Sequence, residues 1–142
     1  MMLNLEFLLN KGYTFEKLTE LTELDLSDNL IESIDEKLFD TSYYLKRLCL
    51  KNNKLTSLHA NTFIKQTKLT YLDLSDNQFE IIEEKLFEKC SNLRCLILSD
   101  NKLTSLHANT FIQQTQLTRL DLGNNQIESI DEKLFNQCSN LR

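Results

Sequence analysis

Leucines return along this chain at a fixed spacing of 24 residues and always in the same frame. The frame reads L-x-x-L-x-L-x-x-N, and its copies begin at Leu21, Leu45, Leu69, Leu93 and Leu117. A second apolar set follows, and one phenylalanine completes each copy, at Phe39, Phe63, Phe87, Phe111 and Phe135. A period kept through five copies without insertions predicts a solenoid, in which each copy buries its apolar side chains against its neighbours.

The L-x-L part of each copy predicts a short β-strand. Leucines two apart point to one face of a strand, and the residues around them point to the other face, toward solvent. Stacked strands would carry these outward residues in two columns, with Lys51 two residues further along its strand. We predict that ligand contacts come from this surface: Glu23, Arg47, Tyr71, Cys95 and Arg119 in the first column, and Asp25, Cys49, Asp73, Ile97 and Asp121 in the second.

Four residues of these columns, Cys49, Tyr71, Cys95 and Ile97, form a small apolar group among charged neighbours. An exposed apolar patch with a polar rim is typical of a contact site. Arg and Tyr are also enriched among the residues that dominate binding energies. The alternative interpretation is an ordinary mixed surface.

An asparagine closes each strand segment, where the chain must turn while it stays packed inside. An Asn side chain supplies two donors and one acceptor in little space, so it can satisfy buried backbone groups of its own turn and of the neighbouring turn. We predict a structural ladder formed by Asn29, Asn53, Asn77, Asn101 and Asn125.

The repeat frame divides the chain into three parts. Residues 1–20 predict an incomplete leading coil that caps the core and is partly helical over 3–9. Phe15 has the offset of the phenylalanine column, and Leu18 has the offset three residues later. Five copies follow, at 21–44, 45–68, 69–92, 93–116 and 117–140, and residues 141–142 begin a sixth. Solenoid ends normally need a polar cap, and none follows here. We therefore expect a fragment of a longer array, or an end that frays or self-associates.

Composition favours one ordered domain. The chain has no proline and two glycines, and no apolar run approaches the ~20 residues that cross a membrane. The first residues lack the basic start of a secretory leader and carry Glu6 within their apolar part. The net charge is −5, and acidic clusters such as Glu32, Asp35 and Glu36 would repel phosphate backbones. We expect neither membrane insertion nor a nucleic-acid partner.

The four cysteines do not indicate a disulfide framework. Cys90 and Cys138 share one offset two copies apart, which corresponds to about 10 Å, whereas a disulfide needs Cα atoms within about 7 Å. We expect both to be buried apolar fillers. Cys49 and Cys95 fall on outward strand positions and are also two copies apart.

The chain offers no recognisable catalytic or metal-binding constellation. It has no C-x-x-C and no clustered histidines. His59 and His107 fall in identical copies of K-L-T-S-L-H-A-N-T-F-I, and duplication explains this pair without a catalytic role. We expect no enzymatic activity, no metal and no cofactor.

The pattern L-x-x-L-x-L-x-x-N-x-L-x-x-L-x-x-x-x-F over residues 15–142 resembles the "typical" class of leucine-rich repeats, known from Toll-like receptors, Slit, the small proteoglycans and the variable lymphocyte receptors of jawless fish. The resemblance implies an α/β-type solenoid that is curved, with a parallel β-sheet on its concave face and irregular or short 3-10 segments on its convex face. It also implies ligand contact on the concave face or an edge. Such families are mostly secreted or on cell surfaces. This chain departs from them by lacking cysteine-clustered caps, N-x-S/T sequons and a proline after the inner leucine.

Three classes of function stay open at this point. The first is a module that recognises a protein ligand through its concave strand face, within a longer receptor-like or secreted protein. The second is an intracellular adaptor or scaffold that uses the same face, which fits the unpaired thiols. The third is a purely structural or engineered array without a ligand. The sequence names neither the ligand nor the cellular compartment.

Overall fold

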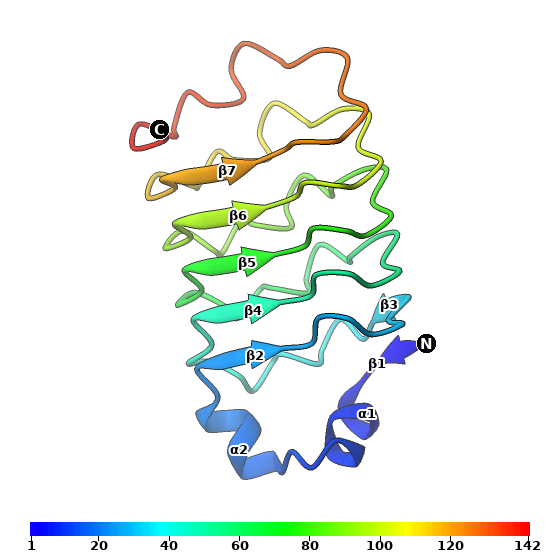
Figure 1. The fold of residues 1–142 in the computed structure, drawn as a ribbon. Coiled ribbons are helices and arrows are strands. Elements are labelled where there is room, and N and C mark those ends of the chain that lie inside the picture. Colours follow the sequence, from blue (N-terminus) through cyan, green and yellow to red (C-terminus); the bar gives the residue numbers. More distant parts are fainter.

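Five short strands, one from each 24-residue copy, stack into a parallel sheet along one side of the chain (Figure 1). In the computed structural model, which describes residues 1–142, the order of the strands in the sheet follows the chain. They are β2 (Glu23–Asp25), β4 (Arg47–Cys49), β5 (Tyr71–Asp73), β6 (Cys95–Ile97) and β7 (Arg119–Asp121). Each strand residue pairs with the residue 24 positions later, as Leu48 does with Leu72. The predicted solenoid with a parallel sheet is confirmed.

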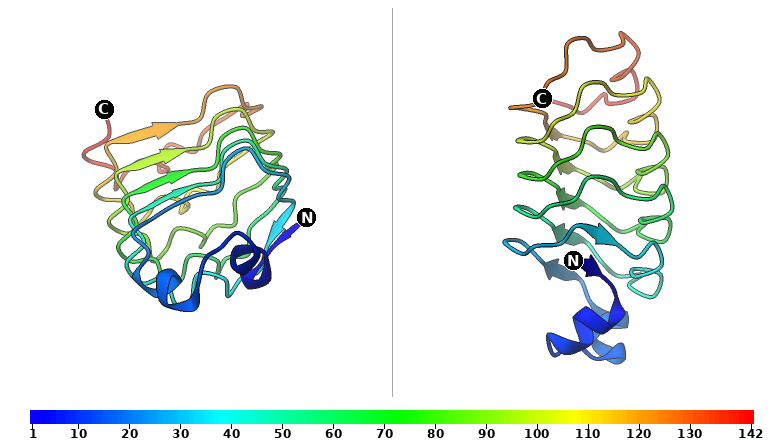
Figure 2. Two further views of the ribbon diagram at one scale, coloured as in Figure 1. Left: turned by 60° about the horizontal axis from the view of Figure 1, so that its bottom comes forward. Right: turned by 90° about the vertical axis from the view of Figure 1, so that its right-hand side faces the viewer.

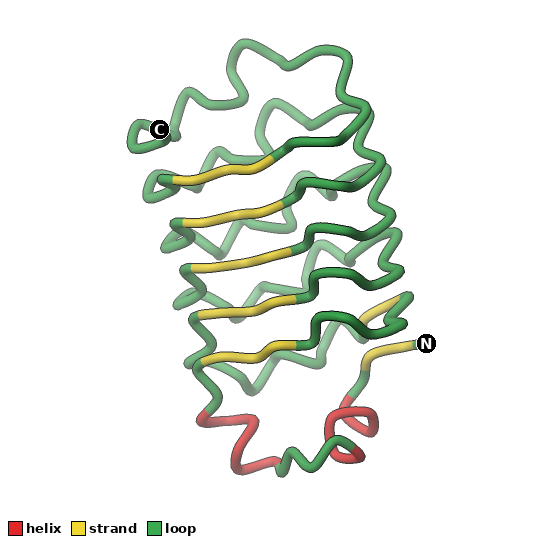
Figure 3. The backbone as a smooth tube through the Cα atoms, viewed as in Figure 1, coloured by secondary structure: helices red, strands yellow, loops and turns green.

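We call each 24-residue copy, including its strand, a coil. Outside its strand, each coil is almost entirely irregular (Figure 3). After the strand the chain leaves the sheet, crosses to the far side and returns through tight turns, so that the coils overlie one another when viewed from below (Figure 2). In the first coil, the Leu38 amide donates to the Asp35 carbonyl at 3.0 Å and the Ser42 amide to the Phe39 carbonyl at 3.0 Å. No helix occurs beyond Glu20.

The inward side chains of all coils form one continuous core. Its 31 buried apolar residues belong to a single cluster, so no coil has a core of its own. Phenylalanines of neighbouring coils stack within this core, with ring centroids 6.1 Å apart for Phe39 and Phe63 and 6.2 Å apart for Phe87 and Phe111. The coils therefore stabilise one another only as neighbours in the stack.

The third residue after each strand of the five-stranded sheet adopts a left-handed backbone conformation. These residues have φ between 51° and 56°, and all are aspartate or asparagine: Asp28, Asn52, Asp76, Asp100 and Asn124. Asp and Asn tolerate this conformation better than other residues with a side chain. Neighbouring coils also bond here, since Nδ2 of the Asn52 side chain donates to Oδ1 of Asp28 at 2.7 Å. The turn is thus encoded by the residue that precedes each ladder asparagine.

The ladder asparagines connect each turn to the coil before it, as Asn77 illustrates. Its Nδ2 donates to the carbonyls of Leu74 (3.2 Å) and Ser75 (3.0 Å) in its own turn and to that of Leu50 (3.0 Å) in the preceding coil. Its Oδ1 accepts the amide of Leu55 at 3.0 Å, again in the preceding coil. Asn53, Asn101 and Asn125 make the same set of bonds. Asn29, in the first coil, bonds only within its own turn.

Residues 1–20 cover the first coil with two short helices, α1 (Leu5–Asn10) and α2 (Phe15–Glu20). The helix expected over 3–9 begins at Leu5 because Asn4 caps it, accepting the Phe7 amide at 2.9 Å. Before it, β1 (Met2–Leu3) pairs in parallel with β3 (Ser33–Ile34), a pairing that the repeat frame does not predict. Leu3, Leu8 and Leu18 are buried and belong to the common core.

The expectation that Phe15 joins the phenylalanine column is wrong. Its side chain is 64% exposed, whereas Phe39 is 1% exposed. In the coils a tight turn carries the phenylalanine inward. Phe15 is instead the first residue of α2, whose start is capped by the Thr14 hydroxyl accepting the Lys17 amide at 3.2 Å. The helix replaces the turn, and the ring is left in solvent.

We expect the fifth coil of the 142-residue chain to open before the others. Ile130 is 51% exposed, whereas Ile34 and Ile82 at the same offset are 9% and 7% exposed. Each apolar side chain that stays unburied forgoes roughly 1.5–3 kcal/mol, so local opening needs less free energy there. Hydrogen exchange followed by mass spectrometry should show faster exchange for residues 117–135 than for 69–87. Equal protection of both segments, together with a concentration-independent monomer in sedimentation, would contradict this and the expected self-association.

Candidate functional site

The sheet places the predicted contact residues side by side on its outward face. Register pairs give one column, Glu23–Arg47–Tyr71–Cys95–Arg119, and a second, Asp25–Cys49–Asp73–Ile97–Asp121. The leucine between the two columns is buried in the first four strands and partly buried in β7. We call these ten residues and Lys51 the strand face.

Arg47 and Tyr71 make the most organised contact on the strand face. The Arg47 guanidinium lies over the Tyr71 ring, with Cζ 4.0 Å from the ring centroid. The Tyr71 hydroxyl donates to Oδ2 of Asp73 at 3.3 Å, which holds the ring. Burial raises the pKa of Tyr71, and the nearby charge of Asp73 adds to this, so the hydroxyl remains a donor. Arg47 takes part in none of the ion pairs of the protein, which leaves its N–H groups available.

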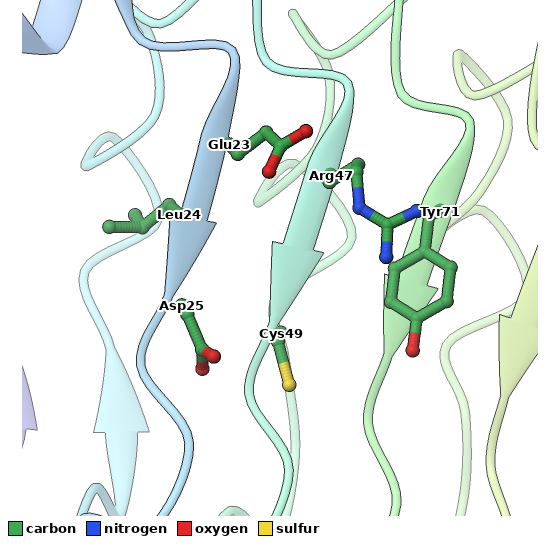
Figure 4. A pocket seen from close by; sticks show the side chains of 6 residues that line it. All are labelled: Glu23, Leu24, Asp25, Arg47, Cys49 and Tyr71. Carbon is green, nitrogen blue, oxygen red and sulfur yellow. The ribbon is translucent and has the colours of Figure 1, made fainter.

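A shallow hollow opens beside this pair (Figure 4). Glu23, Arg47 and Tyr71 of the first column contribute to it, together with Asp25 and Cys49 of the second. In Figure 4 these side chains lie on one side of the sheet, whereas Leu24 points away from them toward the core. The hollow therefore spans three adjacent strands and combines charged, aromatic and thiol groups.

The aspartates of the second column also have a structural task that sequence reasoning missed. Oδ1 of Asp25 accepts the Ser27 amide at 2.9 Å, and Asp73 and Asp121 bond the residue two positions later in the same way, at 2.9 and 3.0 Å. Hydrogen bonds from the Ser27 side chain and amide lower the pKa of Asp25. Asp73 is only 6% exposed, and its carboxylate also accepts bonds from Ser75 Oγ and the Tyr71 hydroxyl. Such Asx turns are a common use of Asp at a strand exit.

The thiols divide as their offsets predict. Cys90 and Cys138 are buried in the core at 0% and 6% exposure, and burial raises the pKa of Cys90 to about 12. Cys49 and Cys95 are half-buried on the strand face, and all four cysteines are free. Burial also raises the pKa of Cys49 and of Cys95, so both are protonated at neutral pH. On the strand face they act as weakly polar surface rather than as nucleophiles.

Charge is distributed unevenly between the two ends of the strands. The segments that lead into β4, β5, β6 and β7, residues 41–47, 65–71, 89–95 and 113–119, contain no Asp or Glu, and neither do residues 137–142. The segment before β2 differs, because it contains Glu20 and Glu23. The remaining chain holds eight cations against 21 acidic residues, a balance of −13. We call the exposed cations of these segments the basic edge: Lys46, Arg47, Lys65, Lys68, Lys89, Arg94, Arg119 and Arg142. Arg47 and Arg119 are the first residues of their strands, and Lys46 and Arg94 directly precede a strand; Arg142 has the same offset as Lys46 and Arg94. Lys65, Lys68 and Lys89 come three to six residues before a strand. The strands begin on the left in Figure 1.

The two histidines lie away from the strand face, each beside a glutamate of the preceding coil. Nδ1 of His59 is 2.7 Å from Oε2 of Glu36, and Nδ1 of His107 is 3.4 Å from Oε1 of Glu84. On the strand face side, Lys51 lies 3.6 Å from the Asp76 carboxylate. No group of three or more His, Cys, Asp and Glu side chains is arranged to hold a metal ion. Neither helix has the length and apolar character that a bilayer crossing requires.

Solved structures similar to this chain are leucine-rich repeat domains. The leucine-rich repeat domain of APL1B has a TM-score of 0.80 and 25% sequence identity, covering 99% of this chain and 41% of that chain. The glycosylated Toll–Spatzle complex of Drosophila has a TM-score of 0.73 and 34% identity, covering 78% of this chain and 14% of that chain. The protein thus spans less than half the length of the APL1B chain and of the chain matched in the Toll–Spatzle complex. No curated protein matched it.

A family model settles the classification. The model of the BspA type leucine-rich repeat region matches residues 11–142 in six copies. Leucine-rich repeat domains commonly mediate protein–protein interaction and are typically binding modules rather than enzymes. The match covers nearly the whole chain, and the solenoid with a parallel sheet is the fold of such repeats. The chain belongs to the BspA-type leucine-rich repeat family.

Proposed function

We propose that the chain is a protein-recognition module that binds its ligand on the strand face, with Arg47 and Tyr71 at the centre of the contact. The observation that carries this proposal is the stack of the Arg47 guanidinium on the Tyr71 ring, held by Asp73. A side chain that is held in place before binding loses less conformational entropy on binding. Tyr and Arg are also the residues most often found at interface hot spots.

The composition of the surrounding surface supports the same function. Cys49, Cys95 and Ile97 are partly exposed next to the stacked pair, and charged residues of both columns surround them. This arrangement resembles the apolar centre and polar rim of a protein contact. The proposal assigns no catalytic step and no cofactor to the chain.

We also propose that the module is part of a longer receptor-like or secreted protein. The chain spans 41% of the APL1B chain and 14% of the chain in the Toll–Spatzle complex, and the latter structure is that of a complex with a partner. The full-length transcript tests this proposal. A leader sequence and further repeats would support it, and an open reading frame that encodes the coils without either would contradict it.

Single substitutions of the stacked pair should weaken ligand binding. Ligands can be selected from a displayed protein library against the immobilised chain and their affinities measured by biolayer interferometry. Arg47→Ala and Tyr71→Ala should each cost at least about 1 kcal/mol, roughly fivefold in Kd, as expected for hot-spot residues. Lys54→Ala is the matched control, because Lys54 is an exposed cation of the same coil outside the strand face. Unchanged affinity in both strand-face variants would exclude this surface as the binding site.

A further inference from the structure

The basic edge has a charge that is not balanced within the protein. The chain as a whole is acidic, with a net charge of −5, yet none of the eight basic-edge side chains belongs to an ion pair. Two of them rest instead on aromatic rings, Arg47 on Tyr71 and Lys68 on Tyr44, whose ring centroid is 4.2 Å from Nζ. A row of exposed cations without partners creates a local positive potential that attracts an anionic ligand.

We infer that the basic edge is the docking surface for an acidic segment of a protein partner. This inference rests on the proposed function and names the chemistry of the ligand. Arg47 belongs both to the strand face and to the basic edge, so one partner can occupy both surfaces without a gap between them. The acidic segment would lie across the strand beginnings, along the stack of coils.

The spacing of the cations matches an extended peptide. Lys46, Arg94 and Arg142 occupy the same offset in every second coil. Two strand spacings correspond to roughly 10 Å. A polyproline II segment advances ~3.1 Å per residue with three residues per turn, so every third side chain faces the same way about 9 Å apart. Acidic residues at every third position of the partner would therefore meet successive cations of this column.

The neighbouring residues favour a polypeptide over a uniformly charged polymer. Tyr43 and Tyr44 are each 52% exposed beside the cations and offer aromatic surface to apolar side chains of a peptide. The second strand column includes Asp25 and Asp121. It lies two residues further along each strand than the column of Arg47 and Arg119, a distance of about 7 Å. A broad polyanion would bring its phosphates or sulfates against these carboxylates, whereas a single extended peptide would not.

A peptide-binding experiment tests the inference. The probe is a fluorescein-labelled (Glu-Pro-Pro)4 peptide, with (Gln-Pro-Pro)4 as its neutral counterpart, measured by fluorescence anisotropy at low and at physiological salt. We expect the Glu peptide to bind and the Gln peptide not to bind. The affinity should fall as salt rises, since salt screens exposed charges. A single-stranded 12-mer of DNA and a heparin oligosaccharide are measured alongside.

Two matched double variants locate the site. Lys46→Gln/Arg94→Gln should weaken the Glu peptide about fivefold, as expected for the loss of two exposed ion pairs. Lys54→Gln/Lys102→Gln removes the same charge from the same two coils, outside the basic edge, and should change the affinity less than twofold. Circular dichroism melting should be unchanged in both variants, because all four side chains are exposed.

Three results would overturn the inference: no binding of the Glu peptide at low salt, an equal loss in both double variants, or tighter binding of DNA or heparin than of the peptide. These results are separable from failure of the proposed function. Library-selected ligands that respond to Tyr71→Ala but not to Lys46→Gln/Arg94→Gln would overturn the inference alone. Ligands indifferent to Arg47→Ala and Tyr71→Ala would instead contradict the proposed strand-face function.

Discussion

Replacing Asn77 by leucine is expected to lower the free energy of unfolding by at least about 3 kcal/mol. Four hydrogen bonds are lost together, three donated by Nδ2 and one accepted by Oδ1. Asn77 is 7% exposed, so water cannot replace these bonds at their buried partners, such as the Leu50 carbonyl and the Leu55 amide. Because those two groups belong to the preceding coil, the substitution weakens the connection between two coils as well as one turn.

Asn61→Ala provides the control for this experiment. Asn61 is exposed, and its only bond to His59 involves the backbone amide, which the substitution leaves in place. Its effect should stay within about 0.5 kcal/mol. Urea unfolding followed by circular dichroism measures both variants. Equal unfolding midpoints for Asn77→Leu and Asn61→Ala would show that the asparagine turns do not stabilise the stack.

Phe63→Ala should destabilise the protein by about 3–5 kcal/mol, the usual cost of removing a buried aromatic side chain. Phe63 is 0% exposed and packs against Phe39 at a centroid distance of 6.1 Å. Coils on both sides enclose the ring, and their tight turns limit how far the resulting cavity can collapse. The same urea titration measures this loss of stability.

Phe15→Ala is the matched comparison, since it removes the same ring at the corresponding offset of residues 1–20. Its ring is 64% exposed, and the loss should be within about 0.5 kcal/mol. A loss of several kcal/mol for Phe15→Ala would mean that Phe15 packs inward in solution. A negligible loss for Phe63→Ala would show that the phenylalanine column contributes little to stability.

The repeat frame allows the sheet to be predicted, because in a solenoid each coil contacts only its neighbours and always at the same offset. A period of 24 residues therefore implies that Arg47 lies beside Tyr71 and that Leu48 lies beside Leu72. The same reasoning does not reach residues 1–20. These residues have no period to follow, and Met2 pairs with Ser33, which no repeat spacing relates to it.

The sequence predicts which residues form the two columns of the strand face, but not which hydrogen bonds and ion pairs their side chains make. The alternation along each strand indicates that Asp73 and Arg47 belong to the outward columns. It does not reveal that Asp73 is used by Ser75 and Tyr71, whereas Arg47 makes no ion pair. The basic edge was missed for a simpler reason. A net charge of −5 conceals it, and only counting charges by offset separates the cations that precede or begin β4 to β7 from the acids of the remaining chain.

The sequence by itself determined which residues of neighbouring coils meet, because period, strand alternation and buried leucines leave one register that places every apolar column inside. The tertiary structure alone decided which polar groups are free to bind a partner. That depends on rotamers and on competing hydrogen bonds, and an aspartate at a strand exit satisfies its own turn as readily as it contacts a ligand. Arg47, stacked on Tyr71 and in no ion pair, and Asp25, bonded to Ser27, occupy the same face but differ in what they can offer to a ligand.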